Sequence, residues 1–595
     1  MNRILTVMAL VLAASLAGCQ KDDGANVPIT GISIAETKTV QIGQTVQLTV
    51  TVTPDNATEK PDFAWSSSDA EVATVDGSGN VTAHGAGDAV ITVRLRSNEA
   101  VQATCTVTGS EDATEYDPDE VVEFEDSKFH ALALYYDKNN DGKLQAWEAA
   151  LVAELNISGN MIRSLKGIEY FTGLERLDCA RNALSSLDVS RNTKLKELRC
   201  ESNQITALDV SMLKSLQVLN CRGNRLSSID VSQNAELTYL KCCLNNGSMI
   251  EGDGITTVDV SNNPKLEVLG VNYLNISELD VTNNPKLKWL DFGYCCHTRW
   301  GDLTPIEHID LSRNPELEYL NCVSSNYPGF GLDELDVSNN PKLKWLTTYG
   351  NPKLGSLDLS RNPELKVLNC CHNSLSALDV TKCPKIDTLY CAYNEIGTLD
   401  LTQSAELVWI NCQNNQIDAL DVSNTKISYL MAPSNRIASI DMGDKTFDTP
   451  SDPTTGYDDA GLPYLYINLN SNRIESIDLS KQKYLYWLEI SGNRLTSLDL
   501  TGCSKVGGVL CNNNALTSLV LEGCTRMWEL HFVNNALSGE LDLSALSLRR
   551  ISAQGNQLET IYVPQGFDPD EKYYLGGTGS LPCYTKDAET NWVEK

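Results

Sequence analysis

"LERLDCARNALSSLDVSRNTK" (residues 174–194) and "LKELRCESNQITALDVSMLKS" (195–215) are consecutive 21-residue segments with the same pattern. The shared pattern is LxxLxCxxNxLxxLDVSxNxx. A unit of this length cannot bury its own leucines, whereas stacked units share one continuous core. The pattern therefore predicts a solenoid of stacked coils. We count 18 coils, whose central apolar positions run from Leu155 to Ile551.

The repeated unit resembles a leucine-rich repeat, specifically the nested 21-residue type in which "LxxLDVSxN" repeats the pattern half a coil later. This resemblance covers residues 155–561 and implies a curved slab with a parallel β-sheet on its concave face. At the usual spacing of parallel strands, 18 coils make a slab about 80 Å long. The recurring Asn182, Asn203 and Asn224 are expected to hydrogen-bond neighbouring backbone at a tight bend.

Many of the 19 cysteines follow the repeat. Nine occupy the inward position after the central apolar residue: Cys179, Cys200, Cys221, Cys242, Cys322, Cys370, Cys391, Cys412 and Cys511. Three more (Cys383, Cys503 and Cys524) replace the second asparagine of the unit. The interval of 21 residues is not a zinc pattern, and parallel inward sulfurs have poor geometry for a disulfide. We expect small buried hydrophobic side chains. Cys243 and Cys371, each next to an inward cysteine, are expected to point outward.

The residue before the central apolar position is often aromatic. Strand alternation places Leu346 in the core and its neighbour Trp345 on the concave face. Eight of the 18 coils have an aromatic residue in this column, although the 7% aromatic content would supply one or two: Tyr239, Trp289, Tyr319, Trp345, Trp409, Tyr429, Tyr466 and Trp487. The next exposed column is mainly polar, as at Asn220 and Asp291. The aromatic stripe is interpreted as a binding surface, with cross-strand packing as the alternative.

Insertions enter just after the concave strand at residues 243–254, 295–305 and 323–331. They occupy one point of the coil, so they are expected to crowd one rim, and Trp300 joins the candidate ligand-binding residues. Neutral growth at a tolerant edge is the alternative. A longer acidic insertion (443–462) enters the opposite half of the coil, and residues 562–595 lose the repeat and are expected to form a carboxy-terminal cap.

A twelve-residue stretch, "DKNNDGKLQAWE" (137–148), offers oxygen ligands at the spacing of an EF-hand loop. Its ligand positions are Asp137, Asn139, Asp141, Lys143 (through its backbone carbonyl), Gln145 and Glu148. Gly142 stands where the loop turns, and the flanking segments have helical apolar spacing. The stretch predicts one bound calcium ion, with a vestigial, metal-free loop as the alternative. Residues 127–154 are expected to form an EF-hand-like cap over the first coil.

Residues 29–109 alternate apolar and polar positions and are rich in valine and threonine, which predicts a β-sandwich. "WSSSDAEVATVDGSGNVTAHGAGDAVITV" (65–93) resembles the bacterial Ig-like domain of group 2, and the resemblance implies a core position for Trp65. An acidic linker (110–126) follows. The predicted fold class is therefore multidomain: an Ig-like β-sandwich, an EF-hand-like helical cap and a leucine-rich-repeat solenoid.

The amino terminus has the parts of a secretory signal, because Arg3 precedes an apolar run too short to span a bilayer. "LAGC" (16–19) resembles a bacterial lipobox, which implies removal of residues 1–18, lipidation of Cys19 and a tether over 19–28. "QKDD" (20–23) resembles the surface-export tag of Bacteroidota lipoproteins. We predict a protein anchored by lipid to the outer membrane and exposed at the cell surface, with no other membrane contact.

The formal net charge of −31 disfavours binding to nucleic acid and to anionic membranes. The six histidines are scattered, and the sequence contains no HExxH, no GxSxG and no glycine-rich phosphate loop. These observations predict that the protein is not an enzyme.

The combination of Ig-like, EF-hand-like and leucine-rich-repeat parts resembles the internalin-like surface proteins, although the order of domains and the repeat type differ. We therefore expect a monomeric, non-catalytic adhesin that recognises a protein ligand on the concave face. The alternative is glycan capture, in which the tryptophans of the stripe stack on sugar rings.

Overall fold

The computed structural model describes residues 27–110, 120–245, 254–295, 305–325, 330–445, 464–570, 572–575 and 579–595. The chain divides into two compact units, Met1–Glu120 and Val121–Lys595. No helix among the described residues combines the length and the apolar character that a membrane span requires.

The smaller unit is a β-sandwich of nine short strands, as the alternating pattern predicts. Its sheets are β2(Thr37–Gln41), β9(Asn98–Ser110), β8(Gly87–Leu95) and β5(Phe63–Ser67); β3(Thr45–Gln47), β7(Asn80–Ala83) and β6(Ala73–Val75); and β1(Gly31–Ser33) with β4(Thr51–Thr53). The core between them includes Val40, Val81 and Ile91. Trp65 is partly buried against this core and lies over Gly79, where a Cβ atom would approach the indole to 2.6 Å.

The larger unit begins with a small helical cap. It consists of α1(Ser127–Ala133), the 3₁₀ turn η1(Leu134–Tyr136) and α2(Ala146–Ala150), and a second turn, η2(Ile168–Tyr170), follows in the first coil. The Asp126 side chain caps α1 by accepting hydrogen bonds from two backbone N–H groups. Phe129 is fully buried, with its ring 6.1 Å from that of Phe171 in the first coil, so the cap covers the amino end of the repeat core.

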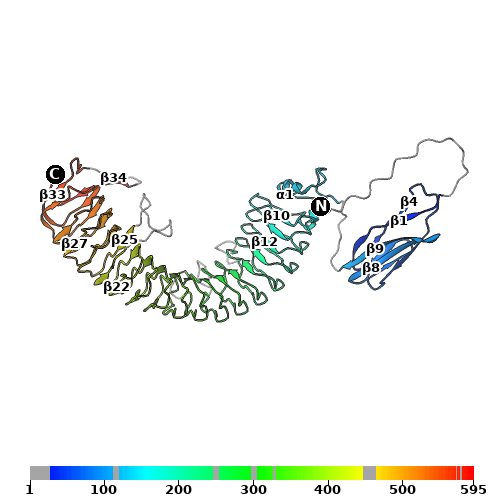
Figure 1. Cartoon of the computed structure of the whole chain (residues 1–595), viewed down its shortest axis with the longest axis horizontal. Helices are drawn as coiled ribbons and strands as arrows, with labels where there is room; N and C mark the ends of the chain where they lie inside the picture. The colour runs from blue at the N-terminus through cyan, green and yellow to red at the C-terminus, as the bar shows by residue number, and fades with distance from the viewer. Residues whose placement is uncertain are drawn as a thin grey trace. The chain divides into compact units, whose positions relative to one another are not determined.

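The repeats form a curved solenoid with one parallel sheet of 19 strands along its length (Figure 1). In spatial order the strands are β10(Glu154–Asn156), β11(Arg176–Asp178), β12(Glu197–Arg199), β13(Val218–Asn220), β14(Tyr239–Lys241), β15(Val268–Gly270), β16(Trp289–Asp291), β17(Tyr319–Asn321), β18(Trp345–Thr347), β19(Val367–Asn369), β20(Thr388–Tyr390), β21(Trp409–Asn411), β23(Tyr429–Met431), β25(Leu465–Asn468), β26(Leu485–Glu489), β28(Gly508–Leu510), β30(Glu529–His531), β32(Arg550–Ser552) and β36(Tyr584–Thr585). The first 18 strands are the 18 coils counted in the sequence.

The carboxy-terminal segment continues the sheet as well as covering it. β36 pairs in parallel with β32 and supplies the nineteenth strand. The other half of the coil carries shorter parallel pairings: β22(Ala419–Asp421) with β24(Ser439–Asp441), β27(Ser497–Asp499) with β29(Ser518–Val520), and β31(Ser538–Asp542) with β33(Gln557–Val563) and β37(Asn591–Glu594). The strands β34(Lys572–Leu575) and β35(Gly579–Pro582) form an antiparallel hairpin.

Two asparagine columns hold consecutive coils together inside this unit. Asn203 donates to the carbonyls of Cys179 and Cys200, both at 3.0 Å, and accepts from the Leu184 N–H at 3.1 Å. Asn284, in the second column, donates to the Val260 and Asn263 carbonyls at 3.0 and 2.9 Å. The predicted hydrogen bonding of asparagine to neighbouring backbone is confirmed.

The nine cysteines that follow the central apolar residues, which we call the ladder cysteines, are buried free thiols, each at most 2% exposed, as predicted. Burial raises the pKa of their thiols, for example that of Cys412 to about 12. Cys243 and Cys371, which were expected to point outward, are outside the set of residues that make up the repeat core, but they are only 3% and 8% exposed. Burial raises the pKa of both thiols to about 11.

Candidate functional site

The eight aromatic side chains of the stripe lie outside the core, on the strand positions that flank the buried central residues. Trp345 is 43% exposed, and the other seven are partly buried. The strands are in register, so that Tyr319 is paired with Trp289 on one side and with Trp345 on the other. The sheet therefore places the predicted residues in one column, in which Val268 separates Tyr239 from Trp289, and Val367 and Thr388 separate Trp345 from Trp409.

The rings form two stacked groups, which we call the first and the second ladder. In the first ladder the Trp289 and Tyr319 centroids are 5.0 Å apart at an interplanar angle of 11°, and those of Tyr319 and Trp345 are 5.9 Å apart at 30°. In the second ladder, Trp409 and Tyr429 are 4.0 Å apart at 22°. The second ladder continues to Tyr466, 4.7 Å from Tyr429 at 12°.

Face-to-face stacking follows from the geometry of the sheet. Rings that project from adjacent strands are held at about the strand separation, which is close to the stacking distance of aromatic rings. Inside each ladder the ring faces therefore cover one another. Trp345, at the end of the first ladder, has Val367 as its neighbour on the next strand and keeps the largest exposed area.

Residues on the adjacent strands contact the aromatic rings near the outer ends of the two ladders. The Lys241 ammonium lies 4.4 Å from the Trp289 ring centroid, a cation–π contact at the start of the first ladder. Beyond the second ladder, Trp487 lies over Gly508, where a Cβ atom would be 2.2 Å from the indole. The absent side chain of Gly508 is what lets this indole lie flat against the next strand.

A carboxylate organises the polar groups beside the second ladder. Glu489 accepts hydrogen bonds from the Tyr466 hydroxyl at 2.7 Å, from the Trp487 indole N–H at 3.1 Å and from the amides of Asn468 and Asn470 at 2.8 Å. Burial, together with the hydrogen bond to Glu489, raises the pKa of the Tyr466 hydroxyl. The network fixes the aromatic and the polar columns relative to each other.

Asp291 is the buried charge of the polar column beside the first ladder. Its side chain is 8% exposed and accepts a hydrogen bond from the Gly293 N–H at 3.1 Å. Burial raises the pKa of this carboxyl to about 6, and the charges of Lys241 and Arg222 oppose the shift.

A second aromatic row escaped the sequence reasoning. Tyr273, Tyr294, His372 and Tyr393 each have a left-handed backbone, with φ between 55° and 59°. Tyr273 and Tyr294 stack at 4.8 Å, and His372 stacks on Tyr393 at 4.2 Å and contacts the edge of Tyr349 at 5.0 Å. The row runs beside the concave sheet in its central coils.

These rings occupy a position that disfavours bulky side chains. Several other coils place glycine or a small polar residue there, as at Gly159 and Ser202, although Arg181 and Leu244 also adopt this conformation. A left-handed backbone costs a non-glycine residue about 1 kcal/mol or more, so an aromatic side chain at this position has to be stabilised by its contacts. The available signal was an aromatic residue just before the consensus asparagine, as in Tyr393-Asn394.

The loop of residues 137–148 turns its backbone N–H groups onto its own ligand side chains. Asp137 accepts from the Asn140 and Gly142 N–H groups at 2.7 and 2.9 Å. Asp141 accepts from the Lys143 N–H at 2.8 Å, and this bond is the main cause that lowers the pKa of its carboxyl. Gly142 has φ +83°, as the sixth position of an EF-hand loop requires.

The twelfth position is fully buried beneath this loop. Glu148 accepts from the Lys138 and Asn139 N–H groups at 2.7 and 3.2 Å and from the Gln145 N–H at 2.9 Å. The Gln145 amide nitrogen donates to Asp141 at 2.6 Å, and a half-turn of that amide would present its oxygen instead. The loop therefore offers carboxylate and amide oxygens, the ligand type that calcium prefers, and in this structure the carboxylates of Asp137 and Glu148 accept hydrogen bonds from backbone N–H groups of the same loop.

Among the described residues, one group of acidic and histidine side chains has its ligand atoms within 4.8 Å of one another: Glu307, His308 and Asp333. The Lys353 ammonium already lies between two of them, 2.6 Å from Glu307 and 3.1 Å from Asp333. This lysine neutralises the acidic charge, so we interpret the group as a surface ion-pair network.

A histidine joins a serine and a glutamate on the concave face near the carboxy-terminal end. His531 lies 2.7 Å from the Ser552 hydroxyl and 2.8 Å from Glu529. The N–H groups of the residues on either side of Ser552 are both used by the sheet, those of Ile551 and Ala553 bonding to β36 and its neighbour at 2.9 and 2.8 Å. An acyl-transfer site needs hydrogen-bond donors that are free to bind its oxyanion, and these two N–H groups are already used.

Two predicted site residues, Cys19 and Trp300, lie outside the described residues. The same is true of the signal segment, of most of the linker and of most of the rim insertions, so their roles stay predictions.

The fold and the site together define the class of protein. The smaller unit is a β-sandwich whose residues 28–107 match the bacterial Ig-like domain (group 2), and the larger is a leucine-rich-repeat solenoid with a long parallel sheet. This is an internalin-like combination of Ig-like and leucine-rich-repeat parts.

Particular proteins resemble parts of the chain. The functional domain of InlJ from Listeria monocytogenes, described as including a cysteine ladder, is 26% identical and covers 75% of this chain and 83% of its own, with a TM-score of 0.50. YopM from Yersinia enterocolitica is 19% identical, and the match covers 79% of this chain and 99% of YopM. Its TM-score of 0.53 shows the shared fold. An uncharacterized protein of Clostridium acetobutylicum is 42% identical over 66 residues, which span 11% of this chain and only 7% of that protein.

Proposed function

We propose that this chain is a non-catalytic binding protein whose concave sheet recognises a protein ligand, as an adhesin does. The leucine-rich-repeat fold and its neighbours support a role in protein interaction. The observation that carries the proposal is the pair of stacked aromatic ladders outside the core, beside the polar network around Glu489 and the buried Asp291.

The stacking supports a protein ligand over a glycan. A sugar ring packs on an open aromatic face, whereas the faces within each ladder are occupied by neighbouring rings. Ring edges and hydroxyls suit the side chains and backbone of a protein surface. Rings held in a stack also lose little conformational freedom on binding, which is a property of interface hot spots.

The test is a screen of displayed proteins and a glycan array against the purified chain. We expect a protein ligand whose affinity falls at least tenfold, about 1.4 kcal/mol, in Trp345→Ala and Tyr429→Ala. Val520→Ala is the matched control, because Val520 is exposed on β29, away from the concave sheet. Capture of glycans alone, or unchanged affinity in both ladder variants, would reject the proposal.

We further propose that residues 137–148 bind one calcium ion, held by Asp137, Asn139, Asp141, the Lys143 carbonyl, Gln145 and Glu148. The ion would tie the loop to the cap that covers the first coil. Calorimetry should show uptake of one equivalent, and calcium should raise the midpoint of thermal unfolding.

Asp141→Ala is the informative variant, because it removes the ligand oxygens at an exposed position whose loss does little to the core. It should abolish both effects, whereas Glu175→Gln, a surface carboxylate of the next coil, should leave them intact. Equal calcium uptake by Asp141→Ala and the parent chain would contradict the assignment.

The sequence at residues 16–19 supports a third proposal, anchoring through a lipidated Cys19 at the outer membrane with the repeats at the cell surface. Metabolic labelling with an alkyne fatty acid should mark the parent chain and not Cys19→Ser. Protease treatment of intact cells should remove the repeats, and a protected chain would argue against surface exposure. Sedimentation of the unlipidated chain should give a monomer.

A further inference from the structure

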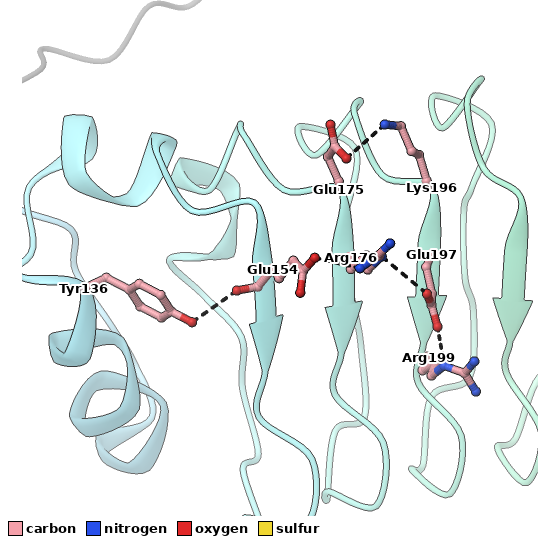
Figure 2. A network of polar contacts seen from close by, with 7 residues as sticks. All are labelled: Tyr136, Glu154, Glu175, Arg176, Lys196, Glu197 and Arg199. Carbon is pink, nitrogen blue, oxygen red and sulfur yellow. Dashed lines mark hydrogen bonds and ion pairs between the residues drawn. The ribbon is translucent and has the colours of Figure 1, made fainter. Parts of the chain in front are cut away.

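A cleft of about 740 Å³ opens between the helical cap and the first strands of the concave sheet. Ala131, Leu132, Tyr135 and Tyr136 of the cap form one wall, and side chains of β10, β11 and β12 form the floor (Figure 2). The volume lies within the usual range of ligand pockets. The cleft is separate from the aromatic ladders, whose first ring, Trp289, is on β16.

The amino edge of the 19-stranded sheet faces this cleft. In the parallel pairing with β11, the Ala153 carbonyl accepts from Arg176 N–H at 3.0 Å, and Ile157 N–H donates to Asp178 at 2.8 Å. Alternate residues of a strand point their backbone groups to opposite sides, so those of Glu154 and Asn156 point toward the cap. The Tyr136 hydroxyl confirms this direction, because it donates to the Glu154 carbonyl at 3.1 Å.

An outer strand edge with free backbone positions is a template for another strand. The cap stands beyond β10 but contributes helices, and its Tyr136 donates to the Glu154 carbonyl, the one hydrogen bond between the cap and that edge among the described residues. The cleft therefore holds backbone donors and an acceptor that an extended peptide pairs with.

The charges of the floor select the side chains of such a peptide. Arg176 lies 2.6 Å from Glu154 and 3.8 Å from Glu197, and Arg199 lies 2.5 Å from Glu197 (Figure 2). The third carboxylate of the floor, Asp178, forms no described ion pair and accepts only from the Ala180 N–H at 3.1 Å. Three carboxylates against two guanidinium groups leave one negative charge for a cation.

The wall offers a second feature that suits a cation. The Tyr135 side chain is 85% exposed, although it is a large aromatic group at the rim of the cleft. An exposed tyrosine beside carboxylates is a favourable place for a lysine or arginine side chain, which makes cation–π and ionic contacts together.

We propose that this cleft binds an extended, basic peptide segment of a partner protein, which adds to β10 as a further strand. Its main chain pairs with the backbone of Glu154 and Asn156. A lysine or arginine on the same side as Glu154 reaches across Asn156 toward Asp178 and lies beside Tyr135.

The experiment measures fluorescence anisotropy with three labelled hexapeptides and the full chain. The first alternates valine and lysine, the second alternates valine and glutamate, and the third is the first with alternate backbone nitrogens methylated. We expect the lysine peptide to bind at least tenfold more tightly than either of the others, because the other two lose the charge and the strand pairing respectively.

Protein variants locate the site. Ala131→Trp fills the cleft from α1 and should abolish binding, whereas Lys128→Trp places the same bulk on an exposed part of that helix outside the cleft and should preserve it. Asp178→Asn should weaken the lysine peptide severalfold. Far-ultraviolet circular dichroism checks that each variant is folded.

The proposal is overturned if the lysine peptide shows no binding up to about 1 mM, or if it binds Ala131→Trp and Lys128→Trp equally. Equal affinity for the lysine and glutamate peptides would also overturn it. Because Trp345→Ala tests the aromatic ladders and not this cleft, failure here is distinct from failure of the ladder proposal.

Discussion

Asp291 shows how a single residue of the concave face works against the stability of the fold. Its folded pKa of about 6 is raised above the ordinary value of 3.8 by burial. A folded state that binds the proton more tightly than the unfolded state loses stability when the group ionises. The loss is absent below pH 3.8, develops between 3.8 and about 6, and is complete above that range.

Asp291→Asn should therefore stabilise the chain at pH 8, by up to about 3 kcal/mol, and have little effect near pH 4. The asparagine oxygen still accepts from the Gly293 N–H, while its amide group replaces the second carboxylate oxygen beside Asn321. Urea unfolding at both pH values measures the difference. A variant that is less stable than the parent at pH 8 would show that ionised Asp291 is held by interactions stronger than its burial. A buried charge kept at such a cost is typical of binding sites.

At the residue scale, the sequence predicted which way a side chain points better than it predicted what packs around that side chain. Strand alternation placed Trp345 outside and Leu346 inside, because it depends on one neighbour. It does not predict exposure, because Cys243 and Cys371 lie outside the core cluster and are still only 3% and 8% exposed. It also missed the stacked Tyr273 and Tyr294, since a left-handed backbone at an aromatic residue has no counterpart in a hydrophobic pattern.

At the scale of the element, the second asparagine column fastens one coil to the next. Seven of its members donate both amide hydrogens to carbonyls and leave the amide oxygen buried without a described partner: Asn192, Asn234, Asn263, Asn284, Asn314, Asn340 and Asn362. The column therefore needs donors alone. Cys383, Cys503 and Cys524 replace asparagine with one weak S–H donor each.

This requirement predicts the order of a substitution series at Asn284. Asn284→Asp should destabilise most, by about 3–5 kcal/mol, because it places a buried carboxylate against two carbonyls. Asn284→Cys should cost about 1–2 kcal/mol, since three coils already use cysteine there. Denaturant midpoints of the two variants and the parent chain measure the order. If Asn284→Asp destabilises the chain no more than Asn284→Cys does, the position does not require a hydrogen-bond donor.

Strands were predictable from the sequence where the same repeat pattern recurs in many coils. The 18 strands of the long parallel sheet from β10 to β32 follow the counted coils, because each coil has an apolar residue at the same central position. Lys445 was not predictable: at the start of the acidic insertion it is 2% exposed and donates to the carbonyls of Val422 and Thr425. Burial lowers its pKa to about 8, and nothing in a charge pattern indicates a buried lysine.

At the scale of the whole solenoid, the ends decide whether the sheet stays closed. At the amino end the cap covers the core through Phe129 but leaves backbone positions of β10 open, whereas at the other end β36 pairs with β32 and the Ile551 N–H donates to the Cys583 carbonyl at 2.9 Å. Removal of residues 564–595 should expose this strand edge and the core behind it.

We expect the truncated chain to unfold at a lower denaturant concentration and to self-associate, as measured by sedimentation velocity. The first ladder is remote from this end, so binding through Trp345 should persist in the fraction that stays monomeric. A truncated chain as stable and as monomeric as the parent would show that β36 is not needed to close the sheet.

The column of unlinked thiols has a mechanical consequence. Each coil contacts only its neighbours, and no covalent bond joins the ladder cysteines across coils. A pulling force on the two ends would therefore peel coils away in succession, and each 21-residue coil would release about 70 Å of slack. Under a sudden load, such a molecule would lengthen in steps before the attachments at its two ends bear the full force.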